Sequence, residues 1–148
     1  MKIDQTDTNE RADTNERGSA IVEAAVTLLG FLIIIFGIFE AGRMISIQQT
    51  LTNAAREGAR LAVLPEWGGT DILPSDTAIE ARVQTFLSAS GMNGATATVV
   101  VDDVTVNSTV AKRVTVTAPY RVLTISMFSF LQVNLRGRAM MRDETNLQ

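Results

Sequence analysis

The chain has 148 residues, a formal net charge of −3, and neither cysteine nor histidine. Without cysteine there is no disulfide scaffold and no thiol chemistry. Without histidine the commonest metal ligand and general base is missing, which disfavours an enzyme, and we expect no metal and no cofactor. No basic stripe with interleaved aromatic residues occurs, so nucleic acid is not an expected partner.

The first eighteen residues form a polar leader. It contains a near-repeat, DTNERA followed by DTNERG, and five acidic residues stand in it against three basic ones. A segment so short and so charged cannot bury a core, so we predict that residues 1–18 are disordered. The leader also differs from a secretory signal, because no small-residue cleavage site follows the apolar run behind it.

An uncharged apolar run occupies residues 24–39. As a helix it would be about 24 Å long, shorter than the roughly 30 Å hydrocarbon layer of a bilayer. Starting the helix at Ser19 lengthens it to about 31 Å, so we predict a transmembrane helix over residues 19–42. Glu23 then lies inside the membrane segment, where an ionisable residue is a candidate functional site; the alternative is that Glu23 marks the interfacial edge of an ordinary single-pass anchor. Basic residues flank both sides equally, so charge does not give the orientation.

Residues 43–64 are predicted to continue this helix in amphipathic form, as one rod to about Leu64. Apolar and small residues at three-and-four spacing form one stripe. Its members are Met44, Ile47, Leu51, Ala54, Ala55, Gly58, Leu61 and Ala62. We interpret Asn53, Arg56, Glu57 and Arg60 as a solvated face, with Glu57 and Arg60 placed for an ion pair.

Residues 65–148 are predicted to form a small domain. The segment PEWGGTDILPSD reads as a loop. A helix follows, opened by a capping box of Thr77 and Glu80 and ended by Gly91, with an apolar face of Ile79, Val83, Phe86 and Leu87.

Three β-rich runs come next: ATATVVVDDVTV, AKRVTVTAPYRV and QVNLRGRAMM. Alternation in the last two is typical of half-buried strands. The apolar LTISMFSFL between them is either a short helix or a membrane-proximal loop. For Asp102 and Asp103 we favour a turn over a ligand site. Arg136, Arg138 and Arg142 are interpreted as the exposed side of the last strand and its tail, and a subunit contact through them stays open. The predicted fold class is α+β: a long N-terminal helix, then one helix on an antiparallel sheet.

These features resemble a known family. A polar leader ending in Gly18, with Glu23 five residues on and an apolar helix behind it, is similar to the processing site of type IV pilin-like proteins. The stretches FGIFEAGRM, LTNAAREGARLAV and GRAMMRDE are similar to the TadE-like family of tight-adherence pilus biogenesis. The resemblance extends from Gly18 to Glu144 and is weakest over residues 65–110.

The resemblance implies cleavage after Gly18 by a membrane prepilin peptidase, which leaves Ser19 as the N-terminus. It implies a minor pilin or pseudopilin in the bacterial inner membrane, with a single pass and the C-terminal domain outside the cytoplasm. The expected partners are the peptidase, other pilins and the pilus assembly machinery. A free α-amino group titrates at about 7.7–8.0 and is cationic at neutral pH. Its partner is either Glu23 of the same chain, one turn away, or Glu23 of a neighbouring subunit, and pairing would offset the desolvation of both charges.

Gly30, Gly37 and Ala41 offer small surfaces where another membrane helix can approach, although small residues are common in such helices anyway. Two other classes of function remain open. One is a single-pass anchor that displays a binding or adhesion module and never joins a filament. The other is an enzyme domain, which the missing histidine and cysteine disfavour. An anchored binder needs no cut between Gly18 and Ser19. Removal of the leader therefore discriminates between the pilin-like subunit and the anchored module.

Overall fold

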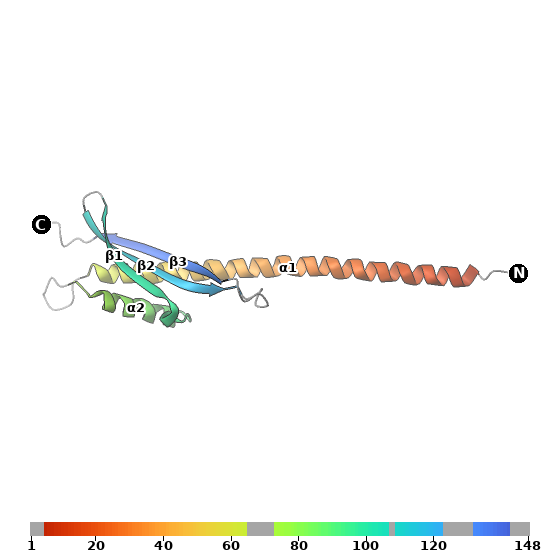
Figure 1. The fold of residues 1–148 in the computed structure, drawn as a ribbon, viewed down its shortest axis with the longest axis horizontal. Helices are drawn as coiled ribbons and strands as arrows, with labels where there is room; N and C mark the ends of the chain where they lie inside the picture. Colours follow the sequence, from red (N-terminus) through yellow and green to blue (C-terminus); the bar gives the residue numbers. More distant parts are fainter. Residues whose placement is uncertain (1–4, 65–72, 107–108, 123–131, 143–148) are drawn as a thin grey trace. The chain divides into compact units, whose positions relative to one another are not determined.

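The computed structural model describes residues 5–64, 73–106, 109–122 and 132–142, with side chains from Arg17 onward (Figure 1). The chain divides into two compact units, Met1–Glu40 and Ala41–Gln148, each of which is considered by itself. The apolar stretch LTISMFSFL lies outside the described residues, as does most of the loop predicted between the two helices.

Helix α1 spans Gln5–Ala62 without a break. The prediction of a disordered leader is therefore wrong for residues 5–18, which continue the helix toward the N-terminus. Extension of an existing helix needs no new nucleus, because each further residue adds a hydrogen bond to turns already formed. Alanine, arginine and glutamate in the leader are also good helix formers. The other end of α1 falls two residues before the predicted Leu64.

The apolar part of α1 in the first unit is uncovered. Every large apolar side chain from Ile21 to Phe39 is exposed, from 40% at Leu32 to 69% at Ile21 and Ile38. Within Arg17–Ala62, the most apolar window has a mean hydropathy of 2.6, and none of it is buried. By length and composition this helix can cross a membrane, and burial in lipid or among other helices would remove its apolar surface from water.

Helix α2 spans Asp76–Ala89 in the second unit. Its N-cap is Ser75, whose hydroxyl accepts a hydrogen bond from the backbone nitrogen of Ala78 at 3.3 Å. The predicted capping box of Thr77 and Glu80 is therefore wrong by two residues: Ser75, next to Pro74, takes the cap first. Gly91 follows the helix with φ of 78°, a left-handed conformation that suits glycine and closes the C-terminus.

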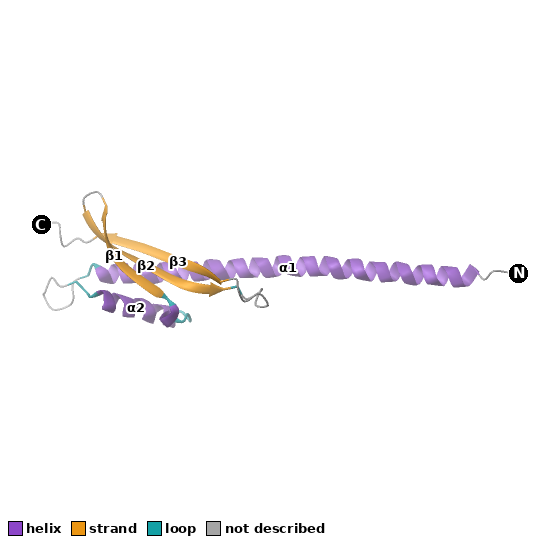
Figure 2. Ribbon diagram, in the orientation of Figure 1, coloured by secondary structure: helices purple, strands orange, loops and turns teal. Residues whose placement is uncertain are grey.

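Three strands form an antiparallel sheet in the order β1-β2-β3 (Figure 2). They span Thr98–Val106, Thr109–Arg121 and Gln132–Arg142. The three predicted β-rich runs are confirmed, except that Gly94–Thr96 forms a short 3₁₀ turn before β1. The turn favoured for Asp102 and Asp103 is wrong, because both residues lie within β1.

Both helices of the second unit contribute to a core on one face of the sheet. Its largest fully buried side chains come from α1, α2 and β2: Leu51, Ile79, Leu87, Val83, Val114 and Val116. The predicted stripe of α1 and apolar face of α2 supply the helical part, although Met44 of the stripe is exposed. The fold class is confirmed as α+β with a long N-terminal helix.

Two glycines let the α1 backbone approach its neighbours. A Cβ at Gly58 would lie 2.7 Å from Cγ2 of Val83 and 3.2 Å from Cγ1 of Val114. A Cβ at Gly137 of β3 would collide with the backbone of Leu51 and the amide nitrogen of Thr52. Next to this contact, the Gln48 amide donates a hydrogen bond to the Arg136 carbonyl at 2.6 Å. Helix and strand are thus in direct backbone contact at Gly137.

Candidate functional site

The helix surface around Glu23 is the first candidate site. Glu23 is exposed on α1, as are Gly18 and Ser19 one turn earlier. Glu23 is one of six exposed residues that line an open, shallow hollow on the surface of the helix. The lining residues are Ala20, Glu23, Ala24, Thr27, Leu28 and Phe31. A carboxylate beside a shallow, mostly apolar hollow on a helix can receive a cation carried by another apolar surface.

The small residues further along α1 are open. A Cβ placed at Gly18, Gly30 or Gly37 would meet nothing within 4 Å. Ala41 is also exposed. None of these positions is needed for packing among the described residues, so each is free to contact another helix.

A latch of Arg43 and Tyr120, which the sequence did not single out, joins α1 to the end of β2. Nε of Arg43 donates to the Tyr120 hydroxyl at 3.0 Å, and Nη2 donates to the Arg121 carbonyl at 2.7 Å. The guanidinium carbon lies 4.8 Å from the centroid of the Tyr120 ring, a cation–π distance. Tyr120 is buried, and it continues the inward alternation of Val114, Val116 and Ala118, which was the one available signal.

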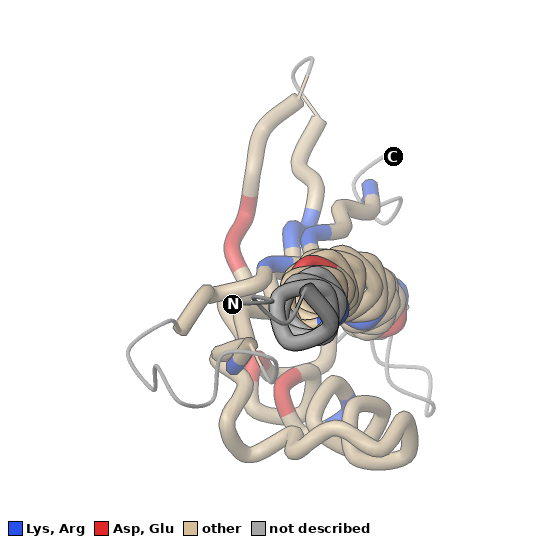
Figure 3. Tube along the Cα trace, turned by 90° about the vertical axis from the view of Figure 1, so that its right-hand side faces the viewer, with Lys and Arg blue, Asp and Glu red and all other residues tan. Residues whose placement is uncertain are grey.

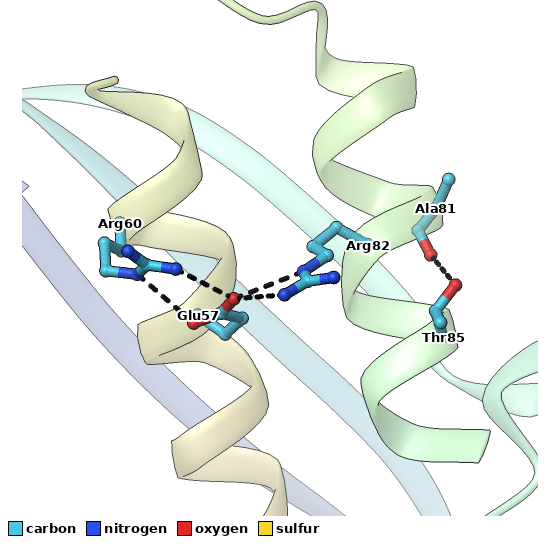
Figure 4. Close-up of polar contacts among 5 residues, drawn as sticks. All are labelled: Glu57, Arg60, Ala81, Arg82 and Thr85. Carbon is cyan, nitrogen blue, oxygen red and sulfur yellow. Dashed lines mark hydrogen bonds and ion pairs between the residues drawn. The ribbon is translucent and has the colours of Figure 1, made fainter. Parts of the chain in front are cut away.

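Glu57 of α1 binds two arginines, of which Arg82 belongs to α2 and so joins the two helices (Figure 4). Arg60 donates to it from the next turn, with Nη2 3.2 Å from Oε1, and Nη2 of Arg82 on α2 lies 2.8 Å from the same oxygen. These hydrogen bonds, Arg60 first and Arg82 second, lower the pKa of Glu57 below its usual value. The predicted pairing of Glu57 with Arg60 is confirmed, whereas the contact with α2 could not be read from spacing.

The paired aspartates of β1 face opposite sides of the sheet, as adjacent strand residues do. Asp102 accepts a hydrogen bond from Arg113 directly across in β2, and this bond lowers the pKa of Asp102. Asp103 forms an ion pair with Lys112 at 2.7 Å. Each carboxylate therefore stabilises strand pairing, and no cluster of metal-ligating side chains occurs among the described residues.

The described chain thus has two units: a helix long and apolar enough to cross a membrane, and an α+β domain that includes the C-terminal part of the same helix. Residues 18–60 match the family model described as TadE-like protein. The match confirms the resemblance inferred from the sequence over that segment, which holds Glu23, the small residues and Arg43. The match covers less than half of the chain. No curated protein and no solved structure matches the chain.

Proposed function

We propose that the chain is a minor pilin-like subunit, a pseudopilin, that assembles a tight-adherence type IV pilus through packing of its N-terminal helix. The observation that carries the proposal is the uncovered apolar length of α1, interrupted by the single exposed carboxylate of Glu23. A lone anchor needs no ionisable residue at that depth, whereas a subunit among identical or related helices can use one to fix its axial position. The proposal includes no catalytic activity and no cofactor.

The proposed maturation step is cleavage between Gly18 and Ser19 by a prepilin peptidase. Both residues are helical in α1 before cleavage, so the peptide bond must leave the helix to be cut. Gly18 favours this step, because glycine is the poorest helix former after proline. The product has a charged amino group and free N–H groups one turn from Glu23, and both attract a carboxylate.

In the proposed topology the first unit spans the bacterial inner membrane once and the second unit lies outside the cytoplasm. Support comes from the apolar helix and from the family match. The alternative is an anchored binding or adhesion module outside any filament. It draws on the independent core of the second unit and on a hollow of about 420 Å³ beside Arg43 and Tyr120.

Processing is tested by intact-mass measurement and N-terminal sequencing of membrane-extracted protein. We expect the mature chain to begin at Ser19 in cells that contain the peptidase, and at Met1 in cells that lack it. Gly18→Ala tests the role of this glycine in cleavage. Alanine fits the position, because nothing lies within 4 Å of it, and as a better helix former alanine should slow cleavage. Recovery of the full leader from peptidase-containing cells would contradict the maturation step.

Assembly is tested by Glu23→Ala. Membrane insertion should persist, because loss of a charge makes the helix more compatible with lipid. The second unit should keep its fold, because none of its core residues precedes Ile47. Crosslinks to partner pilins and pilus production should fall. Glu23→Gln keeps the shape without the charge, so it should fail in the same way if the carboxylate pairs with an amine. Normal piliation with both variants, where deletion of the protein abolishes it, would favour the anchored module.

A further inference from the structure

The face of the sheet that points away from the helices carries a row of arginines. Val114 and Val116 of β2 point into the core. Arg113 directly precedes Val114, so its side chain points to the opposite face of the sheet, away from the core. By the register of β2 with β3, Arg138 lies opposite Thr115 and Arg136 opposite Thr117 on this same face. We name Arg113, Arg136, Arg138 and Arg142 the arginine face. Figure 3 shows basic positions gathered where the strands run side by side.

Among the described residues, the arginine face carries more positive than negative charge. Asp102 is its acidic member in the described part of the sheet, and Asp102 already accepts the hydrogen bond of Arg113. Arg136, Arg138 and Arg142 are exposed and form no ion pair within the described segments, although the charge of Arg138 also contributes to the lowered pKa of Asp102. Alternate residues of a strand stand about 7 Å apart, so Arg136 and Arg138 repel each other across a short distance. A ligand with negative charge would remove this repulsion.

Apolar side chains lie among the arginines. Val100 of β1 is 51% exposed and Met140 of β3 is 49% exposed, and the register places Met140 directly opposite Arg113. Arginine and methionine are both enriched at protein–protein interfaces. A binder of single-stranded nucleic acid would instead present aromatic side chains for base stacking, and the described part of this face has none. The composition therefore favours a protein as the ligand.

A second copy of the chain is a poor occupant. Two arginine faces brought together would place like charges against each other. A head-to-tail contact would need an acidic patch elsewhere. Among the described residues of the second unit outside the sheet face, Glu57 is bound by two arginines and Asp103 by Lys112, and Asp76 and Glu80 of α2 are the acidic residues that remain. Two such carboxylates match the four arginines poorly, so we favour a different protein as the occupant.

We propose that the arginine face binds an acidic surface of a partner protein. Aspartate or glutamate carboxylates of the partner accept hydrogen bonds from Arg136, Arg138 and Arg142, and its apolar side chains cover Val100 and Met140. Arginine suits this role because its planar fork can bind a carboxylate through two parallel bonds. The proposal concerns the second unit alone and holds whether or not the chain is a pilus subunit.

The test measures binding of polyglutamate to the full-length protein in nanodiscs. The nanodiscs contain neutral lipid, so that a charged membrane does not compete with polyglutamate for the arginines. Fluorescence anisotropy at fixed ionic strength compares wild type with the double variant R136Q/R138Q. The matched control is R56Q/R60Q, which removes two arginines from the exposed face of α1 and leaves Arg82 on Glu57. We expect the double variant to weaken polyglutamate binding at least tenfold and the control to change it less than twofold. Melting curves of both variants establish that each is folded.

Three results would overturn the proposal. If the wild-type protein does not bind polyglutamate, the arginine face binds no acidic partner, and the role left for its charges is to prevent edge-to-edge pairing of strands. Equal losses in the two double variants would mean that net charge, and not this face, controls binding. An oligodeoxynucleotide of equal charge that binds more tightly than polyglutamate, with the same dependence on Arg136 and Arg138, would identify the ligand as nucleic acid.

Discussion

Gly137 is the residue at which β3 meets the backbone of α1. No side chain fits there, because the atoms in the way are backbone atoms of Leu51 and Thr52, which cannot move aside as a flexible side chain can. The neighbouring hydrogen bond from Gln48 to the Arg136 carbonyl holds the strand at the same height on the helix. One small residue therefore fixes how closely the sheet packs against α1.

Gly137→Ala is expected to destabilise the second unit by about 3 kcal/mol, the upper part of the range for overpacked cores. Urea unfolding followed by circular dichroism measures the loss. Gly42→Ala is the control, because a Cβ there meets nothing within 4 Å. That change should leave stability unchanged or raise it by up to about 1 kcal/mol, as alanine is the better helix former. Similar stability of the two variants would mean that β3 does not contact α1 at Gly137.

At the scale of the elements, Glu57 links two helices that are distant in the sequence. Arg60 shares its helix, whereas Arg82 comes from α2. Both arginine side chains are more than half exposed, so the pair with α2 orients the helices more than it stabilises them. The apolar contacts of Gly58, Val83 and Ile79 beside it provide the main attraction.

The lowered pKa of Glu57 makes the stability of this contact depend on pH. A carboxylate whose pKa is lower in the folded state stabilises the fold above the unfolded value, and that stabilisation is lost as pH falls through the folded value. The loss is therefore expected below the ordinary value of 4.5. Thermal melts from pH 6 to pH 3 should show a smaller acid shift for Glu57→Gln than for wild type. Because Asp102 titrates in the same direction, Asp102→Asn is the parallel variant, and an unchanged acid shift in Glu57→Gln would contradict the role of Glu57.

At the scale of the whole molecule, the helix that is apolar in the first unit becomes a component of the core in the second. The core of the second unit draws on residues from Ile47 to Ala139, so it takes nothing from the apolar helix before it. The latch of Arg43 lies just inside the second unit. The boundary of an independently folding fragment should therefore fall before Arg43.

A fragment of residues 41–148 is expected to fold in solution, with a cooperative thermal transition. A fragment of residues 44–148 lacks Arg43 and its bonds to Tyr120 and Arg121, so it should be less stable by about 2 kcal/mol. Arg43→Ala in the longer fragment separates loss of the latch from simple shortening of the helix, and it should account for most of the difference. A molten or aggregating 41–148 fragment would show that the core needs the membrane helix or partner subunits.

Sequence reasoning was most successful where the signal is local. Three such signals are the apolar run that ends at Phe39, the apolar stripe of α1 around Leu51 and the alternation of β2. Each can be seen within a few residues or turns, because helix and strand periods repeat along the chain. It failed at the ends of elements. Residues 5–18 were assigned to disorder by their charge, although an established helix extends into them at little free-energy cost.

By itself the sequence predicted an apolar helix long enough to cross a membrane, the α+β class and the candidate residues Gly18, Ser19 and Glu23, since these depend on composition and on short spacings. Only the tertiary structure decided which distant residues meet. The latch of Arg43 on Tyr120 and the backbone contact at Gly137 join segments more than seventy residues apart. No period in the sequence encodes such contacts, because they depend on strand register and on how closely the helix and the sheet pack.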